Sequence, residues 1–170
     1  MVHRTCDKTS VALIVKNGDK ILLIERKKYN PGFALPAGHQ DGLVAKDAAL
    51  KEFEEEVGLR GEKIELRLAI PIQNPCRRDG GTHHFWQVFE VLEYNGDLKP
   101  SNEEVKKIIW ADEEKIKILA EKLEKFLEAH HLAIDDVAKV VEATNKSAQW
   151  LADPGLEPPM YVLFKALKII

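Results

Sequence analysis

Residues 45–57 constrain the fold of this chain more than any other segment, because they have the pattern of a helix with one apolar face. Ala49, Phe53 and Val57 recur at helical spacing, so they are expected to enter a hydrophobic core together. Gly58 follows directly, and glycine often ends a helix because it adopts the left-handed conformation without steric cost. The sequence therefore predicts a helix that packs against a larger structure.

The other side of this predicted helix carries three glutamates, Glu52, Glu55 and Glu56. Their spacing of three and four residues places them within an arc of about 100°. Like charges this close destabilise a helix, so a compensating partner is expected. A divalent cation such as Mg²⁺ or Mn²⁺ suits that role, since it binds carboxylate oxygens. The alternative is a solvated acidic face, where most runs of glutamate lie.

The segment resembles the signature of the Nudix hydrolases, Gly-x5-Glu-x7-Arg-Glu-U-x-Glu-Glu-x-Gly-U, where U is a bulky aliphatic or similar residue. Lys51 stands in place of the signature arginine, Leu43 in place of the first glutamate, and Ala37 in place of the first glycine, with Gly38 one position later. The helical half matches at Glu52, Phe53, Glu55, Glu56, Gly58 and Leu59.

The Nudix resemblance implies an α/β/α sandwich with a mixed β-sheet. It also implies a Mg²⁺- or Mn²⁺-dependent pyrophosphohydrolase that cleaves a nucleoside diphosphate linked to another moiety, by attack of water on phosphorus. Glu52 and Glu56 would be the principal metal ligands, Glu55 an additional ligand, and the Gly38 carbonyl a further one. Lys51 would replace the arginine that orients the glutamates. The alternative is a Nudix-fold module that binds a nucleotide or a partner without catalysis.

The general base is the least defined part of this expected site, because Leu43 cannot accept a proton. Asp41 is the nearest replacement within the loop. Some family members use a glutamate from a later loop, and Glu103 or Glu104 occupies a comparable stretch here. Metal-bound water is already acidic, so the loss at position 43 is expected to slow hydrolysis rather than abolish it.

Two turn regions supply candidates for substrate binding, since cationic side chains hold phosphates and an aromatic ring stacks on a base. Each candidate also fits an ordinary exposed turn position. The candidates are Lys27, Lys28 and Tyr29 before the glycine-bearing loop, and Arg77, Arg78 and His83 in a later turn.

Hydrophobic periodicity predicts the remaining elements. Asn17-Gly18 is a strong hairpin signal between the first two strands. The later apolar repeats predict one helix around 116–127, a second over 134–151 and a third opened by Pro158-Pro159. We expect a Nudix domain at 1–130 and a helical extension at 131–170, packed on that domain or on a second subunit. Strands are expected at 9–16, 20–25, 33–35, 64–72, 85–94 and 105–110.

Composition excludes several classes of function. A net charge of −3 and the lack of a basic stripe argue against binding to duplex nucleic acid. Cys6 and Cys76 are isolated and lack CxxC spacing, so the sequence signals neither a disulfide framework nor a zinc site. No apolar run is long enough to span a bilayer. The expected protein is a cytoplasmic enzyme that acts on a nucleotide or nucleotide derivative, with a homodimer left open.

Overall fold

A mixed β-sheet of seven strands forms the centre of the part of the chain that the computed structural model describes, residues 4–170. β1 pairs antiparallel with β2 and parallel with β6, and the sheet order is β3-β2-β1-β6-β5. β4 pairs with β1, and β7 pairs with β2. The strands are β1 (Thr9–Asn17), β2 (Lys20–Arg26), β3 (Phe33–Ala34), β4 (Ala37–Gly38), β5 (Arg60–Ile72), β6 (His84–Asn95) and β7 (Val105–Ala111).

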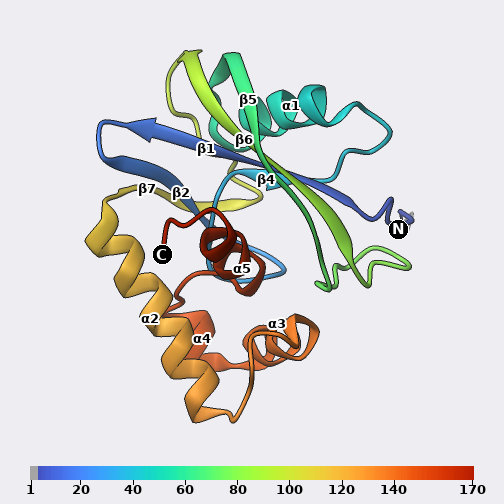
Figure 1. Cartoon of the computed structure of the whole chain (residues 1–170), viewed down its shortest axis with the longest axis vertical. Helices are drawn as coiled ribbons and strands as arrows, with labels where there is room; N and C mark the ends of the chain where they lie inside the picture. Colours follow the sequence, from blue (N-terminus) through green and yellow to red (C-terminus); the bar gives the residue numbers. More distant parts are fainter. Residues whose placement is uncertain (1–3) are drawn as a thin grey trace.

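Helices lie on both sides of this sheet, which confirms the expected α/β/α arrangement (Figure 1). α1 packs against β1, β4 and β5, whereas the C-terminal helices gather on the other side, where α2 contacts β7. None of the helices in the described part of the chain has the length and apolar composition needed to cross a bilayer. The helices are α1 (Ala45–Val57), α2 (Glu113–Ala129), α3 (Val137–Lys146), α4 (Ala148–Ala152) and α5 (Pro158–Ala166).

The two strongest local signals in the sequence fold as expected. Asn17 pairs with Lys20 across a tight turn in which Gly18 has φ +62°, so the predicted hairpin forms. α1 ends at Gly58, which has φ +79° and donates its N–H to the carbonyl oxygen of Glu54 at 2.9 Å. Phe53 is fully buried on the apolar face of α1. The hairpin precedes the glycine-bearing loop at Gly38 in the chain, and α1 follows this loop.

Other elements differ from the sequence prediction. The two-residue strand β4 was not expected, and its pairing with Val11 and Ala12 of β1 holds the loop against the sheet. The single helix expected over 134–151 is two helices, α3 and α4. Ser147 separates them because its hydroxyl accepts the N–H of Trp150 at 3.2 Å and caps the new helix.

The C-terminal extension packs on its own chain. The N–H of Phe33 in β3 donates to the carbonyl oxygen of Gly155 at 2.8 Å, and the N–H of Glu157 donates back to the Phe33 carbonyl at 3.0 Å. The indole N–H of Trp150 donates to the carbonyl oxygen of Pro31 at 2.7 Å. Leu156 is fully buried in the same hydrophobic cluster as the strands. The extension therefore continues the core of the sheet.

Candidate active site

A cavity of about 590 Å³ opens where α1, the loop around β4, the turn between β5 and β6, and the start of α5 meet. Its lining divides by charge. The acidic residues of the lining are Glu52, Glu56, Glu104 and Glu157. The basic residues are Arg4, Arg26, Lys28, Arg77 and Arg78.

Strand β4 brings the glycine-bearing loop against the two glutamates of α1 that line the cavity. A β-carbon on Gly38 would lie 2.1 Å from the carboxyl carbon of Glu52, so only glycine leaves room for this carboxyl group. One oxygen of Glu56 accepts the N–H of Ala37 at 2.8 Å. Glu56 is buried, with 1% of its surface exposed. Both carboxyl groups are therefore held beside the backbone of β4.

Burial changes the protonation of both glutamates. Burial raises the pKa of Glu52 to about 7, and the neighbouring charges of Glu55 and Glu104 add to this effect. Burial raises the pKa of Glu56 to about 8, although Arg26 and the N–H of Ala37 favour its charged form. At pH 7, with no cation bound, Glu56 is therefore mostly protonated and Glu52 about half protonated.

Arg26 joins α1 to the C-terminal extension. It lies at the end of β2, where the register with β7 shifts. Its Nε donates to Glu157 at 2.8 Å, and its Nη1 lies 3.6 Å from Glu56. Glu157 is buried and precedes α5. Sequence reasoning missed both residues, because they are 131 positions apart and match no motif.

The cationic wall comes from two turns. The guanidinium of Arg77 lies 5.8 Å from the ring centroid of Tyr29, and both residues line the cavity. Arg78 forms a two-pronged ion pair with Asp41, in which its Nη2 lies 3.1 Å from the carboxylate. Arg4 lies 3.7 Å from the same carboxylate. Asp41 is thus engaged by cations and does not line the cavity.

The cavity gathers some of the candidates from the sequence and leaves others outside. Leu43, at the position of the first signature glutamate, is 42% exposed. Glu55 pairs at 3.7 Å with Lys51 on the exposed rim of α1, because the arc of the glutamates extends past the cavity edge. The candidates from the sequence that line the cavity are Gly38, Glu52, Glu56, Glu104, Lys28, Tyr29, Arg77 and Arg78. The candidates that lie outside the lining are Lys51, Glu55, Glu103, Lys27 and His83.

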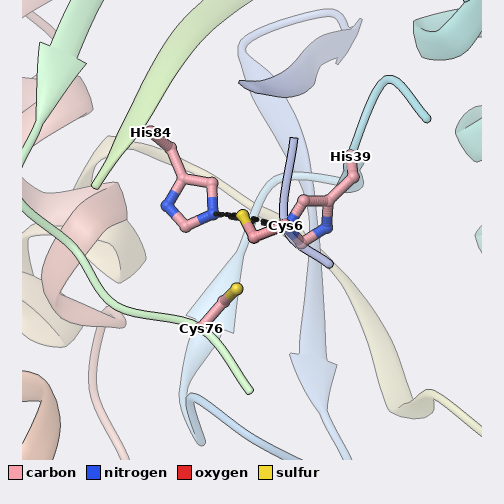
Figure 2. A group of neighbouring side chains, drawn as sticks. All are labelled: Cys6, His39, Cys76 and His84. Atoms are coloured by element: carbon pink, nitrogen blue, oxygen red, sulfur yellow. Dashed lines mark hydrogen bonds between the residues drawn. The ribbon is translucent and has the colours of Figure 1, made fainter. Parts of the chain in front are cut away.

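One wall of the cavity holds a cluster that the sequence did not signal. His39, Cys76 and His84 line the cavity, and the buried Cys6 lies beside them (Figure 2). Burial lowers the pKa of His39 to about 4, and the nearby charges of Arg78 and His84 act in the same direction. Burial raises the pKa of Cys76 to about 11, and Cys6 adds to the rise. The positions of these residues in the sequence, far apart and without a spacing motif, gave no indication of the cluster.

An α/β/α sandwich whose cavity holds helix-borne glutamates opposite cationic side chains fits the hydrolases that act on phosphoric anhydrides. The family model of the NUDIX domain matches residues 7–130, and the chain belongs to the Nudix family. No curated protein sequence is significantly similar to the chain.

Solved structures share the fold at low sequence identity. A MutT NUDIX hydrolase from Burkholderia pseudomallei is 22% identical, with a TM-score of 0.56 over 63% of this chain and 84% of that one. The dihydroneopterin triphosphate pyrophosphohydrolase of E. coli is 16% identical, with a TM-score of 0.54 over 65% and 84%. The NUDIX domain of Shewanella oneidensis NrtR, solved with ADP ribose, is 14% identical, with a TM-score of 0.52 over 69% and 79%.

Proposed function

We propose that this chain is a divalent-metal-dependent pyrophosphohydrolase that cleaves a nucleoside diphosphate linked to another moiety, by attack of water on phosphorus. One observation carries the proposal: the half-buried Glu52 and the buried Glu56 share a cavity with five cationic side chains. A pyrophosphate repels an incoming nucleophile, so its hydrolysis needs both metal-binding carboxylates and positive charge. This cavity offers the two together.

The donor set fits Mg²⁺ or Mn²⁺. Glu52 and Glu56 offer hard carboxylate oxygens, and the lack of a β-carbon at Gly38 lets the carboxyl group of Glu52 lie against the backbone of β4. We assign these two carboxylates and the Gly38 carbonyl to the metal. Glu55 is a secondary ligand in this proposal, because it would have to turn inward from its pair with Lys51. When bound, the ion neutralises phosphate charge and acidifies a water molecule.

The basic wall supports the binding of phosphates. Lys28, Arg77 and Arg78 are the cations that the two turns contribute to the lining, and we assign them to phosphate oxygens. Asp41 fixes the orientation of Arg78 through its two-pronged pair. The ring of Tyr29, which already contacts the guanidinium of Arg77, offers a flat surface for a base or a sugar.

We assign the general base to Glu104, which lines the cavity and has an exposed side chain that water can reach. Leu43 lies outside the lining, and Asp41 is occupied by Arg78 and Arg4. Arg26, rather than Lys51, is the cation that lies beside Glu56. The charge of Arg26, which is half-buried, balances part of the acidic cluster.

The test is a hydrolysis assay with identified products, run with Mg²⁺ and with Mn²⁺. The substrates are nucleoside triphosphates, nucleotide sugars, dinucleotides, ADP-ribose and dihydroneopterin triphosphate. The last two are included because one structure of similar fold was solved with ADP ribose and another is that of a dihydroneopterin triphosphate pyrophosphohydrolase. We expect metal-dependent cleavage that Glu56→Gln lowers by about 100-fold or more, since that variant removes a metal ligand.

Glu54→Gln is the matched control, because Glu54 lies on the same helix but is exposed and pairs with Arg60 at 2.9 Å. It should retain wild-type turnover. In the same assay Glu104→Gln should lower turnover by about 100-fold while Mn²⁺ affinity stays near wild type. If the folded wild-type protein cleaves none of these substrates, the result would contradict the proposed hydrolysis and favour a binding module.

A further inference from the structure

We propose that Cys6, His39, Cys76 and His84 form a tetrahedral site for a structural zinc ion, separate from the carboxylates of α1. The four ligand atoms lie within 4.8 Å of one another. Cys6 comes from the N-terminal segment before β1, His39 directly follows β4, Cys76 lies in the turn between β5 and β6, and His84 begins β6 (Figure 2). This inference stands on its own residues and does not depend on the proposed hydrolysis.

The separations among the ligand atoms of Cys6, His39 and His84 are close to those that zinc requires, and Sγ of Cys76 lies within 4.8 Å of each of these atoms. With Zn–N about 2.05 Å and Zn–S about 2.3 Å, a tetrahedron separates two nitrogens by about 3.3 Å and a nitrogen from a sulfur by about 3.6 Å. Nε2 of His39 lies 3.3 Å from Nε2 of His84, and Sγ of Cys6 lies 3.6 Å from Nε2 of His39. Sγ of Cys6 lies 3.2 Å from Nε2 of His84, slightly closer than the ideal.

Hydrogen bonds with neighbouring backbone groups favour the metal-binding forms of the imidazole and the two sulfurs. Nδ1–H of His84 donates to the carbonyl oxygen of Asn74 at 2.8 Å, which leaves Nε2 unprotonated and directed at the cluster. Sγ of Cys6 accepts the N–H of Lys8 at 3.3 Å, and Sγ of Cys76 accepts the N–H of Arg78 at 3.4 Å. Backbone donors of this kind stabilise thiolates, the form of cysteine that binds metals.

Hydrogen bonding within the cluster is a poorer account of the same geometry. The unprotonated Nε2 of His84 has one lone pair in the plane of its ring, so it accepts one good hydrogen bond. Both the thiol of Cys6 and Nε2 of His39 lie within hydrogen-bond distance of this atom. Nε2–H of His39 can donate to Sγ of Cys6 at 3.6 Å instead, but this leaves the two imidazole nitrogens 3.3 Å apart with no bond between them, whereas a central ion satisfies all four ligands. Two sulfurs with two imidazole nitrogens in a tetrahedron are typical of zinc.

Burial assigns the ion a structural role. Cys6 and His84 are buried at 6% and 1% exposure, and four protein ligands leave no open position for a substrate. The ion would join the N-terminal segment to the turn that carries Arg77 and Arg78. Backbone bonds already run between these segments, from Cys6 N–H to the Asp79 carbonyl at 2.9 Å. The turn is compact, since a β-carbon on Gly81 would lie 2.2 Å from Sγ of Cys76.

The test uses the full chain, reduced and without a histidine tag, and measures zinc content by mass spectrometry and zinc affinity against a chromophoric chelator. We expect one zinc ion per chain with a dissociation constant of about 10 nM or lower. Substitution by Co²⁺ should give the visible absorption of a tetrahedral ion with thiolate ligands. Cys76→Ser and His39→Gln, at the half-buried positions, should weaken zinc binding by about 100-fold or more.

Two control variants distinguish zinc held by these four ligands from zinc bound elsewhere on the chain. His83→Gln changes the neighbouring histidine, whose ring contacts Thr82, and should retain zinc. Glu56→Gln should also retain zinc, because it alters only the carboxylate site. A reduced wild-type protein that binds no zinc would overturn the proposal, and so would unchanged zinc affinity in both ligand variants. A Cys6–Cys76 disulfide in the metal-free, freshly isolated protein would overturn it as well.

Discussion

Burial makes Glu52 and Glu56 sensitive to pH near neutrality, where a glutamate in open water is fully charged. Glu55 lies one turn from Glu52 but points to solvent beside Lys51. The difference between these residues comes from their surroundings, since their chemistry is identical. The side chains of α1 thus divide into two glutamates that line the cavity, Glu52 and Glu56, and an exposed pair on its rim, Lys51 and Glu55.

Mn²⁺ affinity should rise with pH as a result. The pKa of Glu52 is about 7 and that of Glu56 about 8, so at pH 6 the ion must displace protons from both groups, whereas at pH 8 Glu52 is mostly ionised and Glu56 about half ionised. Calorimetry should show affinity higher at pH 8 than at pH 6 by more than about tenfold. The raised pKa values also mean that protonation stabilises the metal-free fold at low pH. That stability is lost as pH rises through 7–8, so Mn²⁺ should raise the Tm more at pH 8 than at pH 6. A flat affinity profile would contradict this account.

At the scale of secondary structure elements, the site depends on how closely β4 approaches α1. Gly38 faces the carboxyl group of Glu52, and the N–H of Ala37 binds Glu56. β4 is held by its pairing with β1, so the sheet sets the distance between the loop and the helix. The two elements act as one unit although a loop of exposed residues separates them in the sequence.

Gly38→Ala tests this contact. The added β-carbon would lie 2.1 Å from the carboxyl carbon of Glu52, and a flexible glutamate tip can turn away without loss of the fold. We expect Mn²⁺ affinity to fall by about tenfold or more. The Tm should change by only a few degrees, because moving one flexible side chain alters the free energy of unfolding only slightly. Ala37→Gly, one residue earlier, leaves both carboxyl groups in place and should bind Mn²⁺ normally. Equal affinities in the two variants would show that the approach of Gly38 is unimportant.

At the scale of the whole molecule, the extension and the Nudix domain share one core. The family match ends at residue 130, yet Leu156, Met160 and Leu163 are fully buried in the hydrophobic cluster that includes the strands. The extension also contributes Glu157 to the cavity, where this residue pairs with Arg26 of β2. We infer that the domain needs its extension both to bury apolar surface and to complete the site.

Two leucines of the extension test the shared core. Leu156→Ala should lower the free energy of unfolding by about 2–5 kcal/mol, because it leaves a cavity at a fully buried position. Leu151→Ala is the matched control, since Leu151 is 46% exposed and should change stability by less than about 0.5 kcal/mol. Urea unfolding followed by circular dichroism measures both. A truncated chain of residues 1–130 that unfolds cooperatively with wild-type stability would contradict a shared core.

The sequence by itself determined the features that depend on neighbours along the chain. The apolar face of α1, its end at Gly58 and the hairpin at Gly18 follow from spacing and backbone conformation, which a few consecutive residues specify. The same local spacing carried the family resemblance that the domain match confirmed. That resemblance also implied the mixed sheet with helices on both sides.

Only the tertiary structure decided which of these residues meet. It separated Glu55 from Glu52 and Glu56, because the edge of the cavity cuts across the arc of the three glutamates. It joined Arg26 to Glu157 across 131 positions, and it brought Cys6 within reach of His84 across 78. Such contacts depend on strand pairing and on the packing of the extension, and local spacing carries no record of either. Contacts of this kind complete the site, so it became visible only when the sheet and its C-terminal helices were seen together.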